Sequence, residues 1–167
     1  FLDVTAKRGK PNAWNRLVRT TDSELLCFCD ADVFVPSYAV SHLATQLRTH
    51  RQLSAIGARM RPLATEGFTL KWLMAVPEAP LGSLHGRLYM MRRREVLTRF
   101  RFFGIKDMPS DIIHEDLWLT YVLGRSRWAE CPTVAVDYLP PSPVDTYRIY
   151  LRHCRGMRQI AVDWAWL

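Results

Sequence analysis

The stretch "LLCFCDADVFVPS", residues 25–37, is an apolar run that ends in two aspartates separated by one alanine. A short apolar run with such a boundary predicts a buried strand over residues 24–30. In α/β sheets, ligands bind beyond the carboxyl ends of the strands. Asp30 and Asp32 stand at such an end, and two carboxylates so close together repel each other. A bound divalent cation is the simplest group that would offset this repulsion.

Strands and helices alternate along the rest of the chain, which predicts βαβ units and a mostly parallel sheet. We expect strands over residues 1–6, 24–30, 54–62, 86–93 and 130–140. We expect helices over residues 10–21, 37–50, 93–100, 115–125 and 144–167. Residues 66–80 are ambiguous, and a helix broken at Pro77 is one interpretation.

Length and composition indicate one ordered domain with a basic surface. The chain has 167 residues, 49% of them hydrophobic, a formal charge of +7 and a pI near 9.6. A basic chain favours anionic partners such as nucleic acid, acidic lipid or phosphate-bearing substrates. The four cysteines have no metal-site spacing and are interpreted as reduced core residues. No apolar stretch approaches the roughly 18 residues that cross a bilayer, and no signal peptide is present. The opening "FLDVTA" and the ending "VDWAWL" suggest a fragment of a longer protein.

Further motifs accompany the aspartate pair, in a fixed order. They are "GKPNAWN" (9–15) before it, then "IIHEDLWLTYVL" (112–123) and "YLRHCRGMRQ" (150–159). The set resembles the family 2 nucleotide-sugar glycosyltransferases, in particular the processive enzymes and the ceramide glucosyltransferases. The family's hallmarks are G-K-x-x-A-x-N, D-x-D at a strand end, E-D opening a helix, and Q/R-x-x-R-W in an interface helix.

The resemblance implies an α/β fold of the GT-A type, in which a nucleotide-binding, Rossmann-like, mostly parallel sheet is flanked by helices. Residues 1–167 would form a single partial catalytic domain from which the family's N-terminal strand or strands are missing. Residues 143–167 would be the signature or interfacial helix.

The resemblance also implies roles for individual residues. Asp116 would be the catalytic base that takes the proton of an acceptor hydroxyl. Asp32 would bind Mg²⁺ or Mn²⁺, and Asp30 would help to hold the ion or lie near the ribose. The other substrate-binding residues implied are Lys10, Asn15, Gly86, Glu115, Arg152 and Arg155. The family's Trp, which borders the acceptor site, is replaced here by Gly156.

Each motif also has a purely structural interpretation. Aspartates are common in loops, and acidic residues such as Glu115 and Asp116 favour the first turn of any helix. Lys10 stands at an ordinary helix start. An Arg-rich helix that carries Arg152 and Arg155 is also typical of a solvated or membrane-facing surface.

The resemblance implies an inverting glycosyltransferase that moves a sugar from a nucleotide-sugar, with UDP-sugar as the expected donor, to a hydroxyl of a lipid or glycan. The full-length parent is expected at the cytoplasmic face of a membrane. One alternative is a degenerate, non-catalytic transferase domain. The other is a basic module that binds polyanions or a membrane surface. None of the usual nucleic-acid-binding motifs is present, so no nucleic-acid partner is expected.

Overall fold

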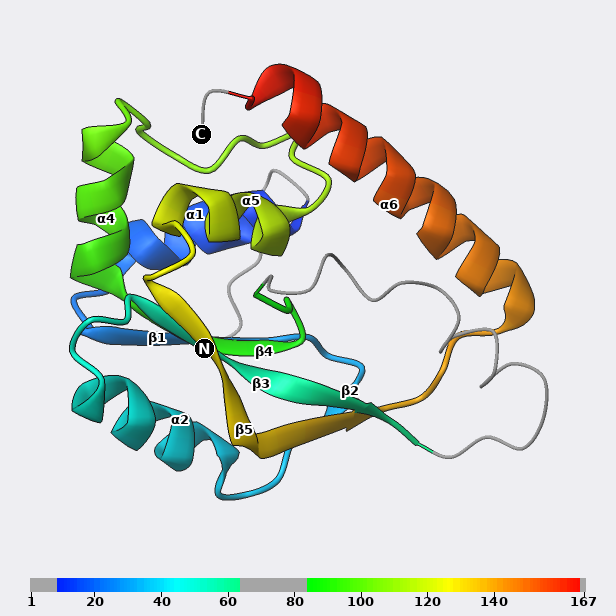
Figure 1. The fold of residues 1–167 in the computed structure, drawn as a ribbon, viewed down its shortest axis with the longest axis horizontal. Coiled ribbons are helices and arrows are strands. Elements are labelled where there is room, and N and C mark those ends of the chain that lie inside the picture. The colour runs from blue at the N-terminus through cyan, green and yellow to red at the C-terminus, as the bar shows by residue number, and fades with distance from the viewer. Residues whose placement is uncertain (1–8, 64–83, 166–167) are drawn as a thin grey trace.

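The computed structural model describes residues 9–63 and 84–165, which form a mixed sheet between two layers of helices (Figure 1). The strands are β1 (Leu25–Cys29), β2 (Val33–Phe34), β3 (Ala55–Pro62), β4 (Leu88–Arg92) and β5 (Trp128–Tyr138). The helices are α1 (Lys10–Thr20), α2 (Ala39–Thr49), α4 (Arg93–Phe102), α5 (Glu115–Leu123) and α6 (Pro143–Asp163). The strand predicted over residues 1–6 and most of the ambiguous segment 66–80 lie outside the described residues.

The strand order is β1-β4-β3-β5-β2. β3 and β5 pair in parallel, whereas β4 is antiparallel to both β1 and β3, and β2 is antiparallel to β5. The α/β class with flanking helices is confirmed, but the prediction of mostly parallel pairing is wrong among the described strands. The apolar run of β4 predicts a strand buried on both faces and contains no signal for its direction. The two-residue β2 was too short to predict from sequence.

Alternating residues of β4 supply the two halves of the core. Leu88 and Met90 pack in one cluster with α2, while Tyr89 and Met91 pack in the other with α1, α4 and α5. This division follows from the two-residue period of a strand, which sends successive side chains to opposite faces. The indole N–H of Trp14 on α1 donates to the Tyr89 hydroxyl at 3.0 Å, which ties α1 to the sheet.

Three element ends meet at one edge of this core. β1 ends at Cys29, and the next backbone N–H, that of Asp30, still donates to the carbonyl of Arg87 at 2.9 Å. α1 begins at Lys10, directly after Gly9, whose φ of 114° is a conformation that favours glycine. α5 begins at Glu115. The fold therefore brings the ends of the predicted motifs together.

The cysteines only partly follow the prediction that all four are core residues. Cys131 is buried and Cys27 half-buried, but Cys29 and Cys154 are exposed; all four are free thiols. A position within an apolar run does not ensure burial at the last residue of a strand, where Cys29 stands. Among the residues that the structure describes, no helix combines the length and apolar character that crossing a bilayer requires.

Candidate active site

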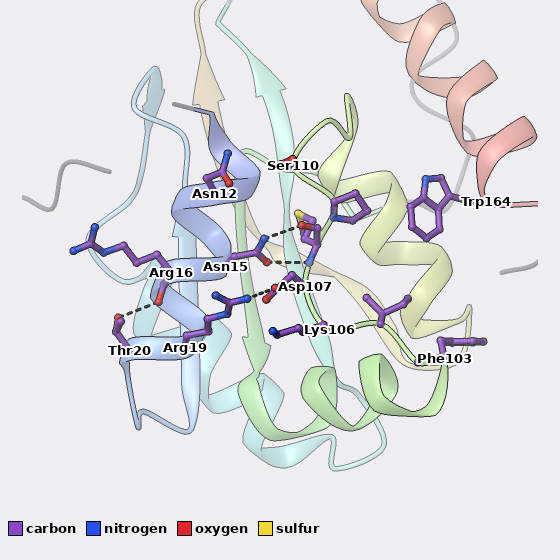
Figure 2. Close-up of a pocket in the computed structure, with 14 residues that line it drawn as sticks. Asn12, Asn15, Arg16, Arg19, Thr20, Phe103, Lys106, Asp107, Ser110 and Trp164 are labelled. Carbon is purple, nitrogen blue, oxygen red and sulfur yellow. Dashed lines mark hydrogen bonds and ion pairs between the residues drawn. The ribbon is translucent and has the colours of Figure 1, made fainter. Parts of the chain in front are cut away.

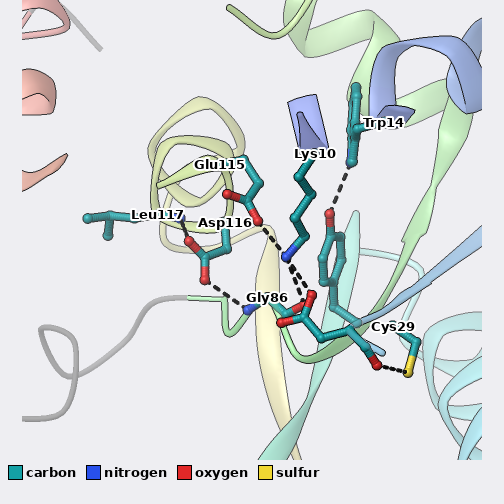
Figure 3. Close-up of polar contacts among 9 residues, drawn as sticks. Lys10, Trp14, Cys29, Gly86, Glu115, Asp116 and Leu117 are labelled. Atoms are coloured by element: carbon teal, nitrogen blue, oxygen red, sulfur yellow. Dashed lines mark hydrogen bonds and ion pairs between the residues drawn. The ribbon is translucent and has the colours of Figure 1, made fainter. Parts of the chain in front are cut away.

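Lys10 lies between two of the predicted acidic residues (Figure 3). Its Nζ is 2.7 Å from Oδ1 of Asp30 at the end of β1 and 2.6 Å from Oε1 of Glu115 at the start of α5. It also donates to the carbonyl oxygen of Gly86 at 3.4 Å. One ammonium group thus joins three segments that are distant in the sequence.

The surroundings of Lys10 favour its charged form. Burial lowers the pKa of Lys10, but the hydrogen bonds to Asp30 and Glu115 outweigh it and leave the pKa above its ordinary value. The Glu115 side chain is only 11% exposed, so its carboxylate depends on this partner more than that of Asp30, at 32%. Lys10 therefore supplies part of the compensating charge that the aspartate pair requires.

A cleft of about 510 Å³ opens beside this cluster. Its volume is in the range of small-molecule sites. Five residues predicted from the sequence line it, together with Pro11, Ala31, Ile112 and Ile113: Lys10, Asp30, Asp32, Glu115 and Arg152. The carboxyl end of β1, the start of α1, the start of α5 and the middle of α6 therefore share one cavity.

The two predicted metal ligands differ in their surroundings. Asp30 gives Oδ1 to Lys10, so its predicted role as a metal ligand competes with an ion pair. Asp32 is exposed and makes no hydrogen bond or ion pair with another described residue. Within residues 9–63 and 84–165, no group of three or more His, Cys, Asp or Glu side chains is arranged to hold a metal. Mg²⁺ is commonly bound by one or two carboxylates together with substrate phosphates and water. Asp32 fits that kind of site.

Asp116 lies behind the cleft wall rather than on it. Its Oδ2 accepts the backbone N–H of Gly86 at 2.8 Å, and its Oδ1 accepts that of Leu117 at 2.8 Å. A Cβ added to Gly86 would lie 3.0 Å from Oδ2 of Asp116 and 3.1 Å from Nζ of Lys10. Gly86 thus lies between Asp116, the predicted base, and the ammonium group of Lys10, and a side chain at position 86 would require one of these groups to shift.

Two other predicted substrate-binding residues lie outside the cleft. Arg155 is exposed on α6 and is absent from the cleft lining, which Arg152 reaches. The Asn15 side chain is engaged with the backbone of Met108: its Nδ2 donates to the carbonyl at 2.7 Å and its Oδ1 accepts the N–H at 2.9 Å. Asn15 therefore holds a loop in place, and the structure does not bring it to the predicted site.

Asn15 instead lines a larger cavity, of about 970 Å³, between α1 and residues 103–110 (Figure 2). Arg19 on α1 forms an ion pair with Asp107 across this cavity. None of the other predicted site residues lines it. This cavity is larger than the cleft, but most of the site residues predicted from the sequence line the cleft instead.

The sequence did not identify Ile112 and Ile113 as part of the cleft wall. The resemblance implies that His114 is a pocket-wall residue, but His114 is absent from the lining of the cleft. The ring centroid of His114 is 5.0 Å from that of His153 on α6. Burial lowers the pKa of His114, the charges of His153 and Arg152 lower it further, and Asp116 and Glu115 oppose the shift.

Comparison with solved structures identifies the architecture. The mannosyltransferase PcManGT from Pyrobaculum calidifontis, solved in complex with GDP-Man and Mn²⁺, superposes with a TM-score of 0.64 at 21% identity, covering 92% of this chain and 42% of that one. Mannosyl-3-phosphoglycerate synthase from Rubrobacter xylanophilus gives a TM-score of 0.51 at 17% identity, covering 95% and 53%. These likenesses show the GT-A fold, and the chain spans about half or less of the length of either neighbour.

Comparison with curated proteins gives no match. The model of "Glycosyl transferase family 2" matches residues 2–108, which is well over half of the chain and includes the first two segments of the predicted site. The chain therefore belongs to glycosyl transferase family 2.

Proposed function

We propose that this domain catalyses transfer of a hexosyl group from a nucleotide-sugar to an acceptor hydroxyl, with inversion at the anomeric carbon and with the help of Mg²⁺ or Mn²⁺. Membership of the family supports the class of reaction. The observation that carries the proposal is the shared cleft, in which Lys10 and Arg152 meet Asp30, Asp32 and Glu115. The positive side chains of Lys10 and Arg152, together with the exposed carboxylate of Asp32, suit a diphosphate that binds in complex with a divalent metal ion.

Each part of the cleft has a distinct task in this proposal. Asp32, with diphosphate oxygens, would hold the cation, which supplies charge neutralisation for the departing nucleoside diphosphate. Arg152 and Lys10 bind the diphosphate oxygens. Asp30 and Glu115 keep Lys10 in position.

Asp116 is the proposed base. Two backbone N–H groups fix the orientation of its carboxylate next to the cleft. A carboxylate acts as a base for an alcohol only when it is held within hydrogen-bond reach of the reacting hydroxyl. Because the acceptor attacks while the diphosphate leaves from the opposite side, one displacement inverts the anomeric centre.

The finer identities also belong to the proposal. We expect a UDP-sugar as donor; GDP-Man and Mn²⁺ in the Pyrobaculum neighbour support a nucleotide-sugar with a divalent ion and make GDP-sugars the comparison donors. We propose a lipid or glycan acceptor at the cytoplasmic face of a membrane. The net charge of +7 and the exposed Tyr147 and Leu151 on α6 support contact with an anionic membrane surface.

The test uses purified full-length protein with UDP- and GDP-sugars, with Mn²⁺ or with a chelator. We expect sugar release or transfer that requires the metal. Asp32→Asn should raise the metal concentration needed at least tenfold, and Asp116→Asn should abolish most turnover. Asp22→Asn, an exposed carboxylate outside the cleft, is the matched control and should behave as wild type. Wild-type turnover in both cleft variants would refute the assignment.

A non-catalytic transferase domain is the second candidate, and the position of Arg155 outside the cleft favours it. Such a domain would bind a nucleotide-sugar without turning it over. Binding raises the melting temperature of a protein when the ligand binds only the native state. A metal-dependent shift with UDP but no product over hours would therefore favour this candidate. Salt-sensitive binding to any polyanion, without a nucleotide effect, would indicate a basic surface module instead.

A further inference from the structure

Gly156 on α6 and His114 before α5 are in closer contact than any other residue at position 156 would allow. A Cβ built on Gly156 would lie 2.1 Å from Cδ2, 2.8 Å from Nε2 and 2.9 Å from Cγ of His114. Carbon atoms in contact are normally about 3.5–4.0 Å apart. The three nearest atoms all belong to the imidazole ring, so the ring occupies the space that any side chain at position 156 would need.

The His114 ring is held in this space by packing. Its Nε2 is buried and has no hydrogen-bond partner among the described residues. The ring also packs against His153, on the same helix as Gly156, with 5.0 Å between the ring centroids and 58° between the ring planes. Without a directional bond, the position of the ring depends on the shape of the surface that α6 presents.

A second contact joins the same two segments. The side-chain Oε1 of Gln159 accepts the backbone N–H of Ile113 at 3.0 Å, and its Nε2 donates to the carbonyl of Asp111 at 3.2 Å. Positions 152, 156 and 159 follow the i, i+4, i+7 spacing of one helix face. One face of α6 therefore holds residues 111–114.

This contact adjoins residues of the cleft wall in both segments. Ile112 and Ile113 precede His114, Glu115 follows it, and all three line the cleft. Arg152, one turn before Gly156, lines the cleft from α6. Any side chain at position 156 must move either the His114 ring or α6, and a shift of α6 away from residues 111–114 would change the separation between Arg152 and Glu115.

We propose that Gly156 and His114 are positioning residues that set the separation of Arg152 from Lys10 and Glu115, and so the width of the cleft for the donor diphosphate. The role in donor binding rests on the proposed function, whereas the contact itself does not. The glycine in the signature helix is thus part of a fitted pair with His114, rather than a loss of function.

The contact is tested by a double-mutant cycle on stability. Alanine normally stabilises a helix interior relative to glycine. We expect Gly156→Ala to lower the melting temperature in the wild-type background because of the ring, and to raise it in the His114→Ala background, where the ring is absent. Gly57→Ala is the matched control, since a Cβ there would meet nothing closer than 3.8 Å. The same sign in both backgrounds would overturn the contact.

Positioning is tested by donor binding, measured by calorimetry with UDP-sugar and GDP-sugar in Mn²⁺. We expect Gly156→Ala to weaken binding or raise the donor KM at least tenfold, and the double variant to return within threefold of His114→Ala alone. A purely structural contact would change the melting temperature and leave the donor KM unchanged. Wild-type donor binding by Gly156→Ala would therefore overturn the inference and leave the proposed function intact. A wild-type protein that binds no nucleotide-sugar would overturn the proposed function, and the positioning role with it.

Discussion

The backbone N–H of Gly86 donates to Oδ2 of Asp116 at 2.8 Å, across 30 residues of sequence. On its carbonyl side, the same Gly86 accepts from Lys10 at 3.4 Å. The backbone of Gly86 therefore links Asp116, the predicted base, to the ammonium group of Lys10. The position of this backbone segment affects the positions of both charged groups.

Gly86→Ala should disturb both partners at once. The added Cβ would lie 3.0 Å from Oδ2 of Asp116 and 3.1 Å from Nζ of Lys10, closer than almost any normal Cβ contact. We expect turnover to fall at least tenfold in steady-state assays, with a modest decrease in melting temperature. Gly57→Ala, which has room for its Cβ, is the control. Unchanged kcat would show that Asp116 does not need this fixed position.

Asp116→Asn isolates the chemistry from the structure. The side-chain carbonyl of Asn can still accept from Gly86, but its amide nitrogen cannot accept from Leu117, so we expect a modest decrease in melting temperature and a donor affinity near wild type. Loss of a general base typically costs about 10²–10⁴ in rate. Single-turnover measurements should therefore show a hundredfold or greater decrease in the chemical step. A decrease below threefold would exclude Asp116 as the base.

Lys10→Met should destabilise the fold at neutral pH, because it leaves the mostly buried Glu115 and its neighbour Asp30 without their shared cation. Breaking a buried pair costs several kcal/mol, and an exposed one almost nothing. For the half-exposed Lys10 we expect a loss of about 2 kcal/mol at pH 7, intermediate between those cases.

Denaturant unfolding at pH 7, at low and at high salt, measures the effect of Lys10→Met. The loss should shrink at high salt, which screens the interaction between partly exposed charges. Lys106→Met, an exposed lysine outside the cleft, is the control and should change stability little. An equal loss at both salt concentrations would argue against an electrostatic role for Lys10.

Acidification should destabilise the native state through His114. The folded pKa of His114 lies below its ordinary value of 6.5, chiefly through burial. The unfolded chain therefore takes up the proton more readily, so stability is retained above about pH 6.5 and decreases as the pH falls below it. The charged groups that face the ring are Glu115 and Asp116 from α5 and Arg152 and His153 from α6.

Melting temperatures between pH 7.5 and 5.5 test this dependence. Wild type should lose more stability over that range than His114→Ala, which lacks the titrating ring. Parallel profiles for the two proteins would mean that His114 does not titrate differently in the folded state.

The acidic motifs were predictable from the sequence because each coincides with an element boundary. Asp30 follows a short apolar strand, and Glu115 opens a helix, most of whose residues are buried; in an α/β fold such boundaries meet at one edge of the sheet. In the structure, Asp32 and Glu115 line one cleft. Asp116 next to Glu115 faces Gly86 instead, because adjacent residues of a helix point in different directions.

Other features had no local signal in the sequence. The direction of β4 depends on how the chain returns to the sheet, which the run Leu88–Met91 does not encode. Asn15 matches its motif, yet its amide is used by the backbone of Met108, a contact that only the fold creates. The resemblance implies that Lys10 is a substrate-binding residue, but its ion pair with Glu115 joins the starts of α1 and α5, which only the fold brings together.

The two sides of the cleft are built from bonds of different kinds. On the β1 side, Asp30 is continuous with the main-chain ladder, because its N–H bonds to the carbonyl of Arg87 on the neighbouring chain segment. On the α6 side, the wall is held by the side chain of Gln159 and by ring packing. Local opening breaks such side-chain contacts more readily than the main-chain hydrogen bonds of a sheet. A bulky ligand would therefore enter the cleft by displacing α6, while the end of β1 that carries Asp30 keeps its position.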